Sequence, residues 1–321
     1  MRAITVQRNG GPEVLEYGQA HDPTPAPGQV LVRVEAVGVN FIDTYFRQGI
    51  YPSKPPYTPG TEGAGTVVAL GDGVTSRSVG DRVAFADGTG TYAELATVPA
   101  DRTVRVPDAV GSDVAASVLL QGMTAHYLTH DSYPVQPGDT VLVHAGAGGT
   151  GLLVTQMAKG LGARVISTVS SDAKAELSRG AGAAATLRYT DDVAGRVREL
   201  TDGAGVAAVY DGVGKDTIQA SLASARPHGY IIAFGAASGP IPPFDLQQLN
   251  SHGSLYIQRP SLGSYVATPQ DFERRSSFVF DGLADGTLRF LVGASYPLAD
   301  AARAHTDLQA RKTTGSVVLI P

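Results

Sequence analysis

A chain of 321 residues with 43% hydrophobic and 17% charged side chains predicts about two globular domains and excludes a disordered or very small fold. The formal net charge of −5 and the lack of any Lys/Arg run argue against a nucleic-acid or acidic-membrane partner. The absence of cysteine excludes disulfides, thiolate nucleophiles, iron–sulfur ligands and every cysteine-bearing zinc site.

The N-terminal residues 1–10 have the pattern of a strand interrupted by polar residues. They lack the basic flank and the apolar run of a signal peptide. No segment reaches the roughly 18 consecutive apolar residues that a membrane-spanning helix needs. We therefore expect a soluble, cytoplasmic protein.

The first third of the chain consists of short apolar or alternating runs broken by Gly and Pro. Between Gln29 and Val37, for example, Val30, Val32 and Val34 share one face, which is the period of a strand. Similar runs follow at residues 65–70, 82–86 and 92–98. This spacing predicts a compact, mostly antiparallel β domain.

From about Pro137 the pattern changes to apolar strands that alternate with amphipathic helices. This alternation predicts a doubly wound parallel sheet with helices on both faces. The expected strands span residues 140–145, 164–169, 184–187, 206–211 and 230–234, and two of the expected helices span 152–161 and 192–200.

After Gly286 the chain has the pattern strand, helix, strand and ends in the apolar, β-branched residues 315–320. We expect this tail to return to the first domain. The predicted organisation is therefore a discontinuous first domain of residues 1–124 and 287–321, and a second domain of residues 125–286.

A glycine-rich turn joins a strand to a helix at residues 141–151. Gly146, Gly149 and Gly151 depart from the G-x-G-x-x-G spacing, but strand, turn, helix and second strand follow in the order that a dinucleotide site requires. Backbone N–H groups and the helix N-terminus would hold a pyrophosphate there. A purely structural glycine loop remains the alternative.

The end of the second strand of this domain indicates which dinucleotide binds. An NAD site normally has Asp or Glu there, whereas this chain has Ser170 and Ser171, with Lys174 just beyond. A hydroxyl and an ammonium suit the 2′-phosphate of NADPH. Tyr189, after the third strand, is also placed to reach that phosphate. For both Lys174 and Tyr189, an ordinary surface position is the alternative.

Together these pieces resemble the NADPH:quinone oxidoreductases of the medium-chain dehydrogenase/reductase superfamily, the group that includes zeta-crystallin. The resemblance covers essentially the whole chain. The matching segments are residues 10–15, 37–45, 59–65, the glycine-rich turn, 210–214 and 259–262.

The resemblance implies a GroES-like, mostly β catalytic domain plus a Rossmann-type domain, the nicotinamide between them, and a homodimer. The cofactor contacts that it implies are Asn40, Thr124, Gly148, Gly149, Thr150, Gly151, Ser170, Lys174, Tyr189, Phe234 and Ser238. The polar catalytic residues that it implies are Asn40, Asp43, Tyr45, Tyr51 and Arg259. A purely structural hydrogen bond between Asp43 and Tyr45 is the alternative for that pair.

Zinc-dependent members of the superfamily would have Cys where Asn40 stands and His where Thr61 precedes Glu62. We therefore expect no metal, and no alcohol oxidation by a zinc mechanism. Two further positions depart from near relatives: Thr150 replaces the usual Val of the turn, and Gln121 stands where Lys is common.

Four other polar residues are weaker candidates. His126 and His130 are four apart in a predicted helix and so share a face, but no acidic partner completes a metal-binding motif. His144, at the end of a core strand, is better explained as a buried side chain with its hydrogen bonds satisfied. Asp211 is compatible with capping a turn or with contacting the cofactor.

The function that this sequence predicts is a zinc-free, NADPH-dependent reductase that transfers a hydride to a quinone. The same scaffold is compatible with reduction of the carbon–carbon double bond of an enal or enone. A non-catalytic, NADPH-binding structural or RNA-associated protein is a third possibility, against which the acidic balance argues.

Overall fold

The computed structural model describes residues 1–321 and divides them into two compact units. The first unit comprises Met1–Gln121 and Thr268–Pro321, and the second comprises Gly122–Ala267. The boundary between them falls within the helix α2 (Ser112–Tyr127).

The first unit is built on a seven-stranded sheet that is antiparallel except for one pair, as the alternating runs predict. In sheet order its strands are β14 (Val292–Pro297), β15 (Ser316–Ile320), β3 (Gln29–Val39), β4 (Gly63–Leu70), β5 (Arg82–Phe85) and β7 (Thr103–Arg105), with β6 (Leu95–Pro99) paired to β3. A separate two-stranded sheet joins β1 (Arg2–Val6) to β2 (Leu15–Gln19). Valines on alternate positions of β3 face a core that contains Val32, Val67 and Phe85.

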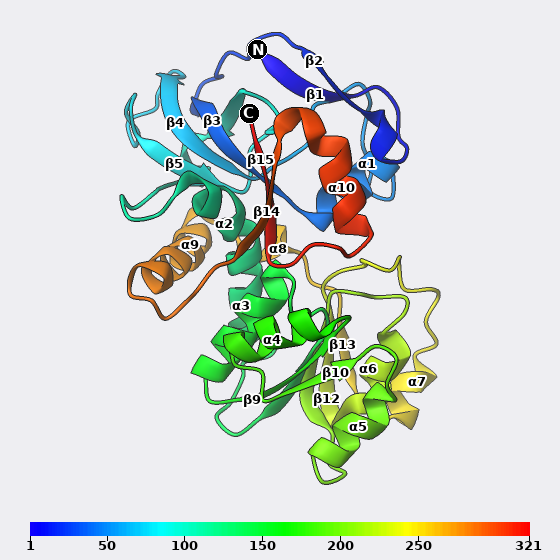
Figure 1. Cartoon of the computed structure of the whole chain (residues 1–321). Helices are drawn as coiled ribbons and strands as arrows, with labels where there is room; N and C mark the ends of the chain where they lie inside the picture. The colour runs from blue at the N-terminus through cyan, green and yellow to red at the C-terminus, as the bar shows by residue number, and fades with distance from the viewer. The chain divides into compact units, whose positions relative to one another are not determined.

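The C-terminal tail adds β14, the helix α10 (Ala301–Gln309) and β15 to this unit. β15 pairs antiparallel with β3, so that Val317 lies opposite Val39, and Figure 1 shows the red strand beside the blue one. Leu298, Ala301 and Leu319 pack with the N-terminal Ile4 and Val6 in one apolar cluster. Burial of that cluster anchors the tail to the start of the chain.

The run at residues 92–98 is only partly a strand, because β6 begins at Leu95. The N–H of Tyr92 donates to the carbonyl of Pro59 and its carbonyl accepts from the N–H of Ile4. These bonds take Tyr92 away from the ladder that β6 forms with β3. They also bury its side chain completely.

The second unit contains a six-stranded, wholly parallel sheet, as predicted. In sheet order its strands are β10 (Ala185–Arg188), β9 (Arg164–Val169), β8 (Thr140–Val143), β11 (Val206–Asp211), β12 (Ala225–Ala233) and β13 (Tyr256–Gln258). From β8 the chain first builds outward through β9 and β10, and then through β11, β12 and β13 on the other side. The reversal lies between β8 and β11, which is where such sheets bind ligands, at the carboxyl ends of the strands.

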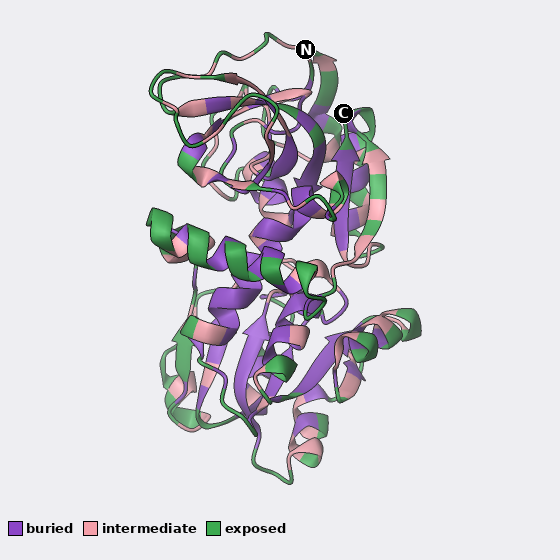
Figure 2. Cartoon of the chain, turned by 90° about the vertical axis from the view of Figure 1, so that its left-hand side faces the viewer, coloured by how far each residue is buried: buried purple, intermediate pink, exposed green.

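Helices cover the sheet of the second unit and alternate buried and exposed residues along their length (Figure 2). Leu142, Ile166, Val209 and Ile231 form the centre of its core. The helices of this unit after α2 are α3 (Gly149–Gly160), α4 (Asp172–Ala181), α5 (Val193–Leu200), α6 (Ile218–Ser224), α7 (Gln247–Ser251) and α8 (Leu262–Tyr265), with a π-helical turn at Leu128–Ser132.

The remaining helices belong to the first unit. They are α1 (Phe41–Gln48), α9 (Pro269–Ala284) and three short 3-10 turns at Pro12–Val14, Ala100–Arg102 and Leu298–Asp300. The Asp43 carboxylate accepts from the N–H of Asn40 at 2.8 Å and so closes the first turn of α1. Among all the helices, none has both the length and the apolar character that crossing a membrane requires.

Candidate active site

The glycine-rich turn lies between β8 and the N-terminus of α3. A Cβ on Gly146 would lie 2.5 Å from the Cβ of Ser167, and one on Gly151 would lie 2.3 Å from the carbonyl oxygen of Ala145. Both positions therefore require glycine for close packing of turn, strand and helix. Ala145 itself adopts the left-handed region, with φ of 55°. The turn presents backbone N–H groups at a helix N-terminus, the geometry that binds anions.

Tyr189 lies next to this turn, because its hydroxyl accepts a hydrogen bond from the Ala145 N–H at 2.8 Å. Ser170 is exposed directly after β9. Lys174 is half-buried in the first turn of α4, where its N–H donates to the capping hydroxyl of Ser171 at 3.3 Å. The carboxyl ends of β8, β9 and β10 thus carry the polar groups predicted for the phosphate site.

Arg188 is a residue of this region that the sequence analysis did not single out. It is the last residue of β10 and lies opposite Val169, the residue before Ser170. One guanidinium nitrogen, Nη2, donates to Asp172 Oδ1 at 2.5 Å, while Nη1 is buried without a hydrogen-bond partner. The available signal was a basic residue directly before Tyr189 at a strand end.

The turn after β11 is held by Asp211, which is fully buried. Its Oδ1 accepts from the N–H groups of Val213 and Gly214, each at 2.9 Å, and its Oδ2 accepts from the Ser221 hydroxyl at 2.7 Å. The turn-capping interpretation of Asp211 is therefore confirmed. His144 is likewise satisfied, since its ring nitrogens lie 2.8 Å from Thr168 Oγ1 and 3.1 Å from Ser221 Oγ.

Phe234 and Ser238 lie on the loop after β12, against the turn that Asp211 holds. The Phe234 N–H donates to the Asp211 carbonyl at 2.9 Å, and the Ser238 hydroxyl donates to the Val213 carbonyl at 2.8 Å. Both predicted residues thus belong to the same edge of the sheet as the glycine-rich turn. Thr124, on α2, is buried in the second unit.

The polar catalytic residues predicted from the resemblance divide between the units. Asn40, Asp43, Tyr45 and Tyr51 belong to the first unit, while the exposed Arg259 follows β13 in the second. The rings of Tyr45 and Tyr51 pack edge to face with centroids 5.4 Å apart.

Asn40 forms a buried hydrogen-bond network with Glu62. Its Nδ2 donates to Glu62 Oε2 at 2.6 Å, and its Oδ1 accepts from Gln121 Nε2 at 3.3 Å. Gln121 also donates to the Ser316 hydroxyl at 3.2 Å, and Glu62 Oε1 accepts from the Leu120 N–H at 2.8 Å. Burial raises the pKa of the Glu62 carboxyl to about 8, although these hydrogen bonds lower it. In the sequence, the position of Glu62 directly after Thr61 gave no sign of this buried network.

Asp43 is the second buried carboxyl of the first unit. Its Oδ2 accepts from the Asn40 N–H at 2.8 Å and from the Tyr92 hydroxyl at 3.1 Å. Burial raises the pKa of Asp43 to about 7 against these two hydrogen bonds. The hydrogen-bond partners of Asp43 Oδ2 are thus Asn40 and Tyr92.

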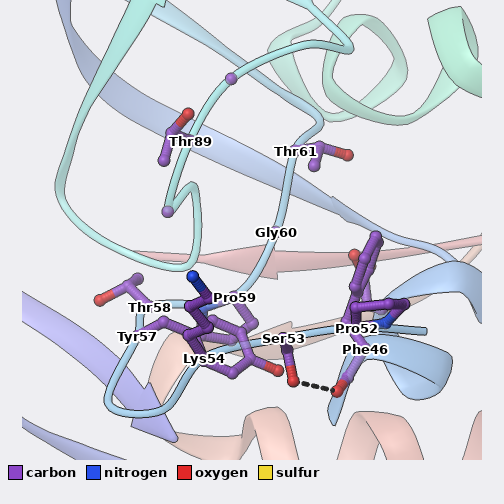
Figure 3. A pocket seen from close by; sticks show the side chains of 13 residues that line it. Phe46, Pro52, Ser53, Lys54, Tyr57, Thr58, Pro59, Gly60, Thr61 and Thr89 are labelled. Atoms are coloured by element: carbon purple, nitrogen blue, oxygen red, sulfur yellow. Dashed lines mark hydrogen bonds between the residues drawn. The ribbon is translucent and has the colours of Figure 1, made fainter. Parts of the chain in front are cut away.

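Asp43 also lines an open pocket of about 260 Å³ in the first unit (Figure 3). Thr61 and Thr89 lie toward the top of the view, and Lys54 and Tyr57 toward the bottom. Apolar walls come from Phe46, Pro52 and Pro59. Asp43 is the one predicted catalytic residue that lines this pocket, whose lining thus combines a buried carboxyl and an ammonium with apolar walls.

His126 and His130 stack with ring centroids 4.2 Å apart. His130 Nδ1 lies 3.0 Å from the His126 carbonyl oxygen and 2.9 Å from the Thr129 hydroxyl. No group of three or more His, Asp or Glu side chains in the structure is arranged to hold a metal ion.

Comparison with known proteins identifies relatives of both units. The sequence matches the family model for the alcohol dehydrogenase GroES-like domain over residues 26–108 and that for zinc-binding dehydrogenases over residues 149–280. A quinone oxidoreductase of Pseudomonas aeruginosa is 48% identical over 315 residues, which is 97% of each chain. A 2-haloacrylate reductase of a Burkholderia species is 42% identical over 99% of this chain and 98% of its own. A mycobacterial protein solved in complex with NADPH is 55% identical, with a TM-score of 0.98 over 100% of both chains.

Glu62 should make the stability of the protein depend on pH. Because its folded pKa of about 8 lies above the ordinary value of 4.5, the stability that the neutral carboxyl contributes is full below about pH 4.5 and is lost as the pH rises through about 8. Between about pH 6 and about pH 9 the wild type should therefore lose about 2 kcal/mol or more that Glu62→Gln does not lose. Thermal unfolding followed by circular dichroism at both pH values measures this difference. The exposed Glu16→Gln is the control, and an equal loss in Glu62→Gln and wild type would contradict the assignment.

Proposed function

The chain belongs to the medium-chain dehydrogenase/reductase family, in the branch of the quinone oxidoreductases, and on this basis we propose that it is an NADPH-dependent quinone reductase. The observation that carries the proposal is a glycine-rich turn beside Tyr189 at the sheet edge of the second unit, combined with a pocket lined by Asp43 in the first. Each supplies one half of a hydride transfer: a place for the donor and a place for the acceptor.

The residues of the second unit fit NADPH. Gly146 and Gly151 leave no room for side chains, so that the backbone of the turn can approach a pyrophosphate. Ser170 and Lys174 offer a hydroxyl and an ammonium to a 2′-phosphate, and the buried Nη1 of Arg188 lacks a partner that such a phosphate could provide. The relative solved with NADPH supports this choice of cofactor.

When bound, NADPH supplies a hydride from its nicotinamide ring. We assign the turn residues Gly148, Gly149, Thr150 and Gly151 to its pyrophosphate, and Ser170, Lys174, Tyr189 and Arg188 to its adenosine phosphate. Asn40, Thr124, Phe234 and Ser238 are proposed to hold its nicotinamide half. These assignments extend the sequence prediction by one residue, Arg188.

The residues of the first unit do not fit zinc, although one of the matching family models is named for it. The chain has no cysteine, and Asn40 carries an amide, which is not among the usual zinc ligands and is hydrogen-bonded to Glu62 and Gln121. Reduction of a quinone does not require a Lewis acid, because hydride addition gives a delocalised hydroquinone anion that hydrogen bonds stabilise. The proposed reaction therefore uses no metal ion.

For the acceptor we propose that Asp43 and the pocket it lines bind the quinone oxygens, and that Tyr45, Tyr51 and Arg259 orient the ring. An ammonium from Lys54 at the same pocket would favour an electron-rich oxygen during reduction. Binding groups at the edge of an apolar slot orient a flat molecule without covalent contact.

The second candidate function is reduction of an activated carbon–carbon double bond. The observation that favours it is the 42% identity with a 2-haloacrylate reductase over nearly the full length. Such a reaction needs a proton delivered to carbon rather than to oxygen. A non-catalytic NADPH-binding role is distinguished from both by the absence of turnover.

The acceptor can be tested by following oxidation of NADPH and NADH in the presence of an ortho-quinone, a para-quinone, a 2-alkenal and a 2-haloacrylate. We expect NADPH-dependent turnover with a quinone at least about tenfold above that with either alkene, a difference of about 1.4 kcal/mol in barrier. Preferential turnover of an alkene would move the function to double-bond reduction. No turnover with any acceptor would leave the non-catalytic role.

Lys174→Ala tests the cofactor assignment. Loss of a charge-assisted hydrogen bond to the 2′-phosphate should raise the KM for NADPH about tenfold or more and leave the KM for NADH nearly unchanged. Lys159→Ala removes the same charge from an exposed position in the last turn of α3 and serves as the control. Equal effects of Lys174→Ala on the two cofactors would remove Lys174 from the phosphate site.

We further propose a cytoplasmic homodimer. Supporting this, β13 is an edge strand of the second sheet, and Tyr256 and Ile257 are 55% and 36% exposed on it. Light scattering should give about twice the 33.2 kDa mass of one chain, and Ile257→Lys should shift the mass toward one chain. The matched control is Val79→Lys, at a 63% exposed position of the first unit. A single-chain mass for the wild type would overturn the dimer.

A further inference from the structure

Behind Asp43 lies a chain of three fully buried polar side chains from separate segments of the first unit. They are Arg47 on α1, Tyr92 on the loop before β6 and His305 on α10. Arg47 Nη1 lies 3.0 Å from His305 Nδ1, His305 Nε2 lies 2.9 Å from the Tyr92 hydroxyl, and that hydroxyl lies 3.1 Å from Asp43 Oδ2. The proposed hydride transfer does not account for this chain.

The direction of every hydrogen bond in the chain follows from Arg47. A guanidinium has donors only, so His305 Nδ1 must accept and the ring proton of the neutral imidazole must lie on Nε2. His305 therefore donates to the Tyr92 oxygen, and the Tyr92 hydroxyl must turn its own proton to Asp43. Burial and the Arg47 charge lower the pKa of His305 to about 3, which agrees with a neutral ring.

Arg47 is itself held in place from two other sides. Its Nε donates to the Gly10 carbonyl at 3.2 Å and its Nη2 donates to Gln309 Oε1 at 2.8 Å. Burial lowers the pKa of Arg47, but a guanidinium keeps its proton in proteins. The chain thus ends in a group that cannot release a proton, and it orients Asp43 rather than conducting protons to it.

The consequence for Asp43 is that its two oxygens differ. Oδ2 accepts two hydrogen bonds, from the Asn40 N–H and from the Tyr92 hydroxyl, so a proton on this carboxyl must reside on Oδ1. Because Asp43 lines the pocket and Oδ2 is occupied by these two donors, we infer that Oδ1 is the oxygen that meets a ligand there. A buried carboxyl that is protonated near neutral pH and accessible from a pocket is a suitable general acid.

We propose that Arg47, His305 and Tyr92 are positioning residues that hold Asp43 with its Oδ1 proton directed at the quinone oxygen. This inference rests on the proposed quinone reduction. Hydride addition leaves one oxygen of the product as an anion; the O–H bond at Asp43 Oδ1 breaks, a new O–H bond forms on that oxygen, and the Asp43 carboxylate regains a proton from solvent. The transfer is downhill, because a phenolic hydroxyl, with a pKa of about 10, is a weaker acid than Asp43.

Other ionisable groups also face Asp43. Burial and, to a smaller extent, the Asp43 charge raise the pKa of Glu62, before β4, and of the Tyr57 hydroxyl on the loop after α1. Lys54 lines the same pocket, and Arg47 adds a positive charge one helical turn along α1. These groups are unchanged by substitutions at Tyr92, so a shift caused by Tyr92→Phe reports the loss of its hydrogen bond.

The direct test is titration of Asp43 by carbon-13 NMR in protein with labelled Asp, with the signal assigned by its loss in Asp43→Asn. Tyr92→Phe removes one donor to the carboxylate and should raise the midpoint by about one pH unit or more. His305→Gln keeps an acceptor for Arg47 and a donor for Tyr92 and should stay within about half a unit of wild type. Tyr210→Phe, which removes a buried hydroxyl without a partner in the second unit, is the matched control and should not shift it. An unshifted midpoint in Tyr92→Phe would overturn the inference.

A second measurement needs no disruptive variant. Nitrogen-15 NMR of labelled His, assigned by His305→Gln, should show His305 as the neutral Nε2–H form between about pH 5 and about pH 9. The opposite form, or titration in that range, would overturn the direction of the chain.

The pH dependence of kcat/KM for quinone reduction links the chain to the reaction, because this ratio reports the pKa of the protein before the quinone binds. The basic limb should move upward in Tyr92→Phe by the same amount as the NMR midpoint and remain in place in His305→Gln and Tyr210→Phe. If the wild type reduces quinones but this limb does not follow the NMR midpoint, the inference fails and the proposed function stands. If the wild type reduces no quinone, the proposed function fails, while the NMR midpoints still decide whether the chain positions Asp43.

Discussion

The buried guanidinium of Arg47 is the constraint on which the polar interior of the first unit depends. Its donors connect α1 to two segments that are distant in the sequence: the N-terminal turn through Gly10, and the helix α10 through His305 and Gln309. A cation without water must have its donors satisfied, since removing one partner leaves a buried charge uncompensated. The C-terminal tail therefore contributes polar as well as apolar contacts to the first unit. Two of the acceptors that satisfy the buried Arg47 guanidinium, His305 and Gln309, lie on α10.

The second unit also contains a buried ionisable side chain that is surrounded by hydrogen-bond partners. Asp211 is a buried carboxyl group, and backbone N–H groups of Val213 and Gly214 together with the Ser221 hydroxyl donate hydrogen bonds to it. These bonds fix the turn on which the loop of Phe234 and Ser238 rests. In both units a buried ionisable side chain thus fixes segments close to candidate site residues: α1 with Asp43 in the first unit, and the turn beside Phe234 and Ser238 in the second. Rigid support of this kind is what hydride transfer between two bound rings requires.

The sequence predicted the structural features that depend on neighbouring residues. It did not predict the contacts between residues that are far apart in the chain. The strands β9 and β11 coincide with the predicted runs, because short apolar segments between amphipathic helices have few alternative structures. The glycine-rich turn was recognisable because its order of strand, turn and helix lies within one continuous segment. The link between Arg47 and His305 spans 258 positions, and neither residue type signals burial, so nothing local could reveal it. Arg188 escaped notice for a related reason: its place beside Val169 depends on the register of two strands.

The same buried groups bear on the choice between the two reactions that this scaffold supports. Where a zinc-dependent relative would place a metal, this chain has an amide paired with a protonated acid, Asn40 with Glu62, so charge that develops on the substrate must be met by hydrogen bonds and protons. In the arrangement that we propose, Asp43 holds a proton on Oδ1, and oxygen anions accept such a proton readily. Protonation of carbon requires a donor that is aligned with one particular carbon orbital. A carboxyl group at the edge of an open pocket does not provide this alignment. The arrangement around Asp43 therefore favours reduction of a quinone over reduction of a double bond, for a reason that is independent of the names of its relatives.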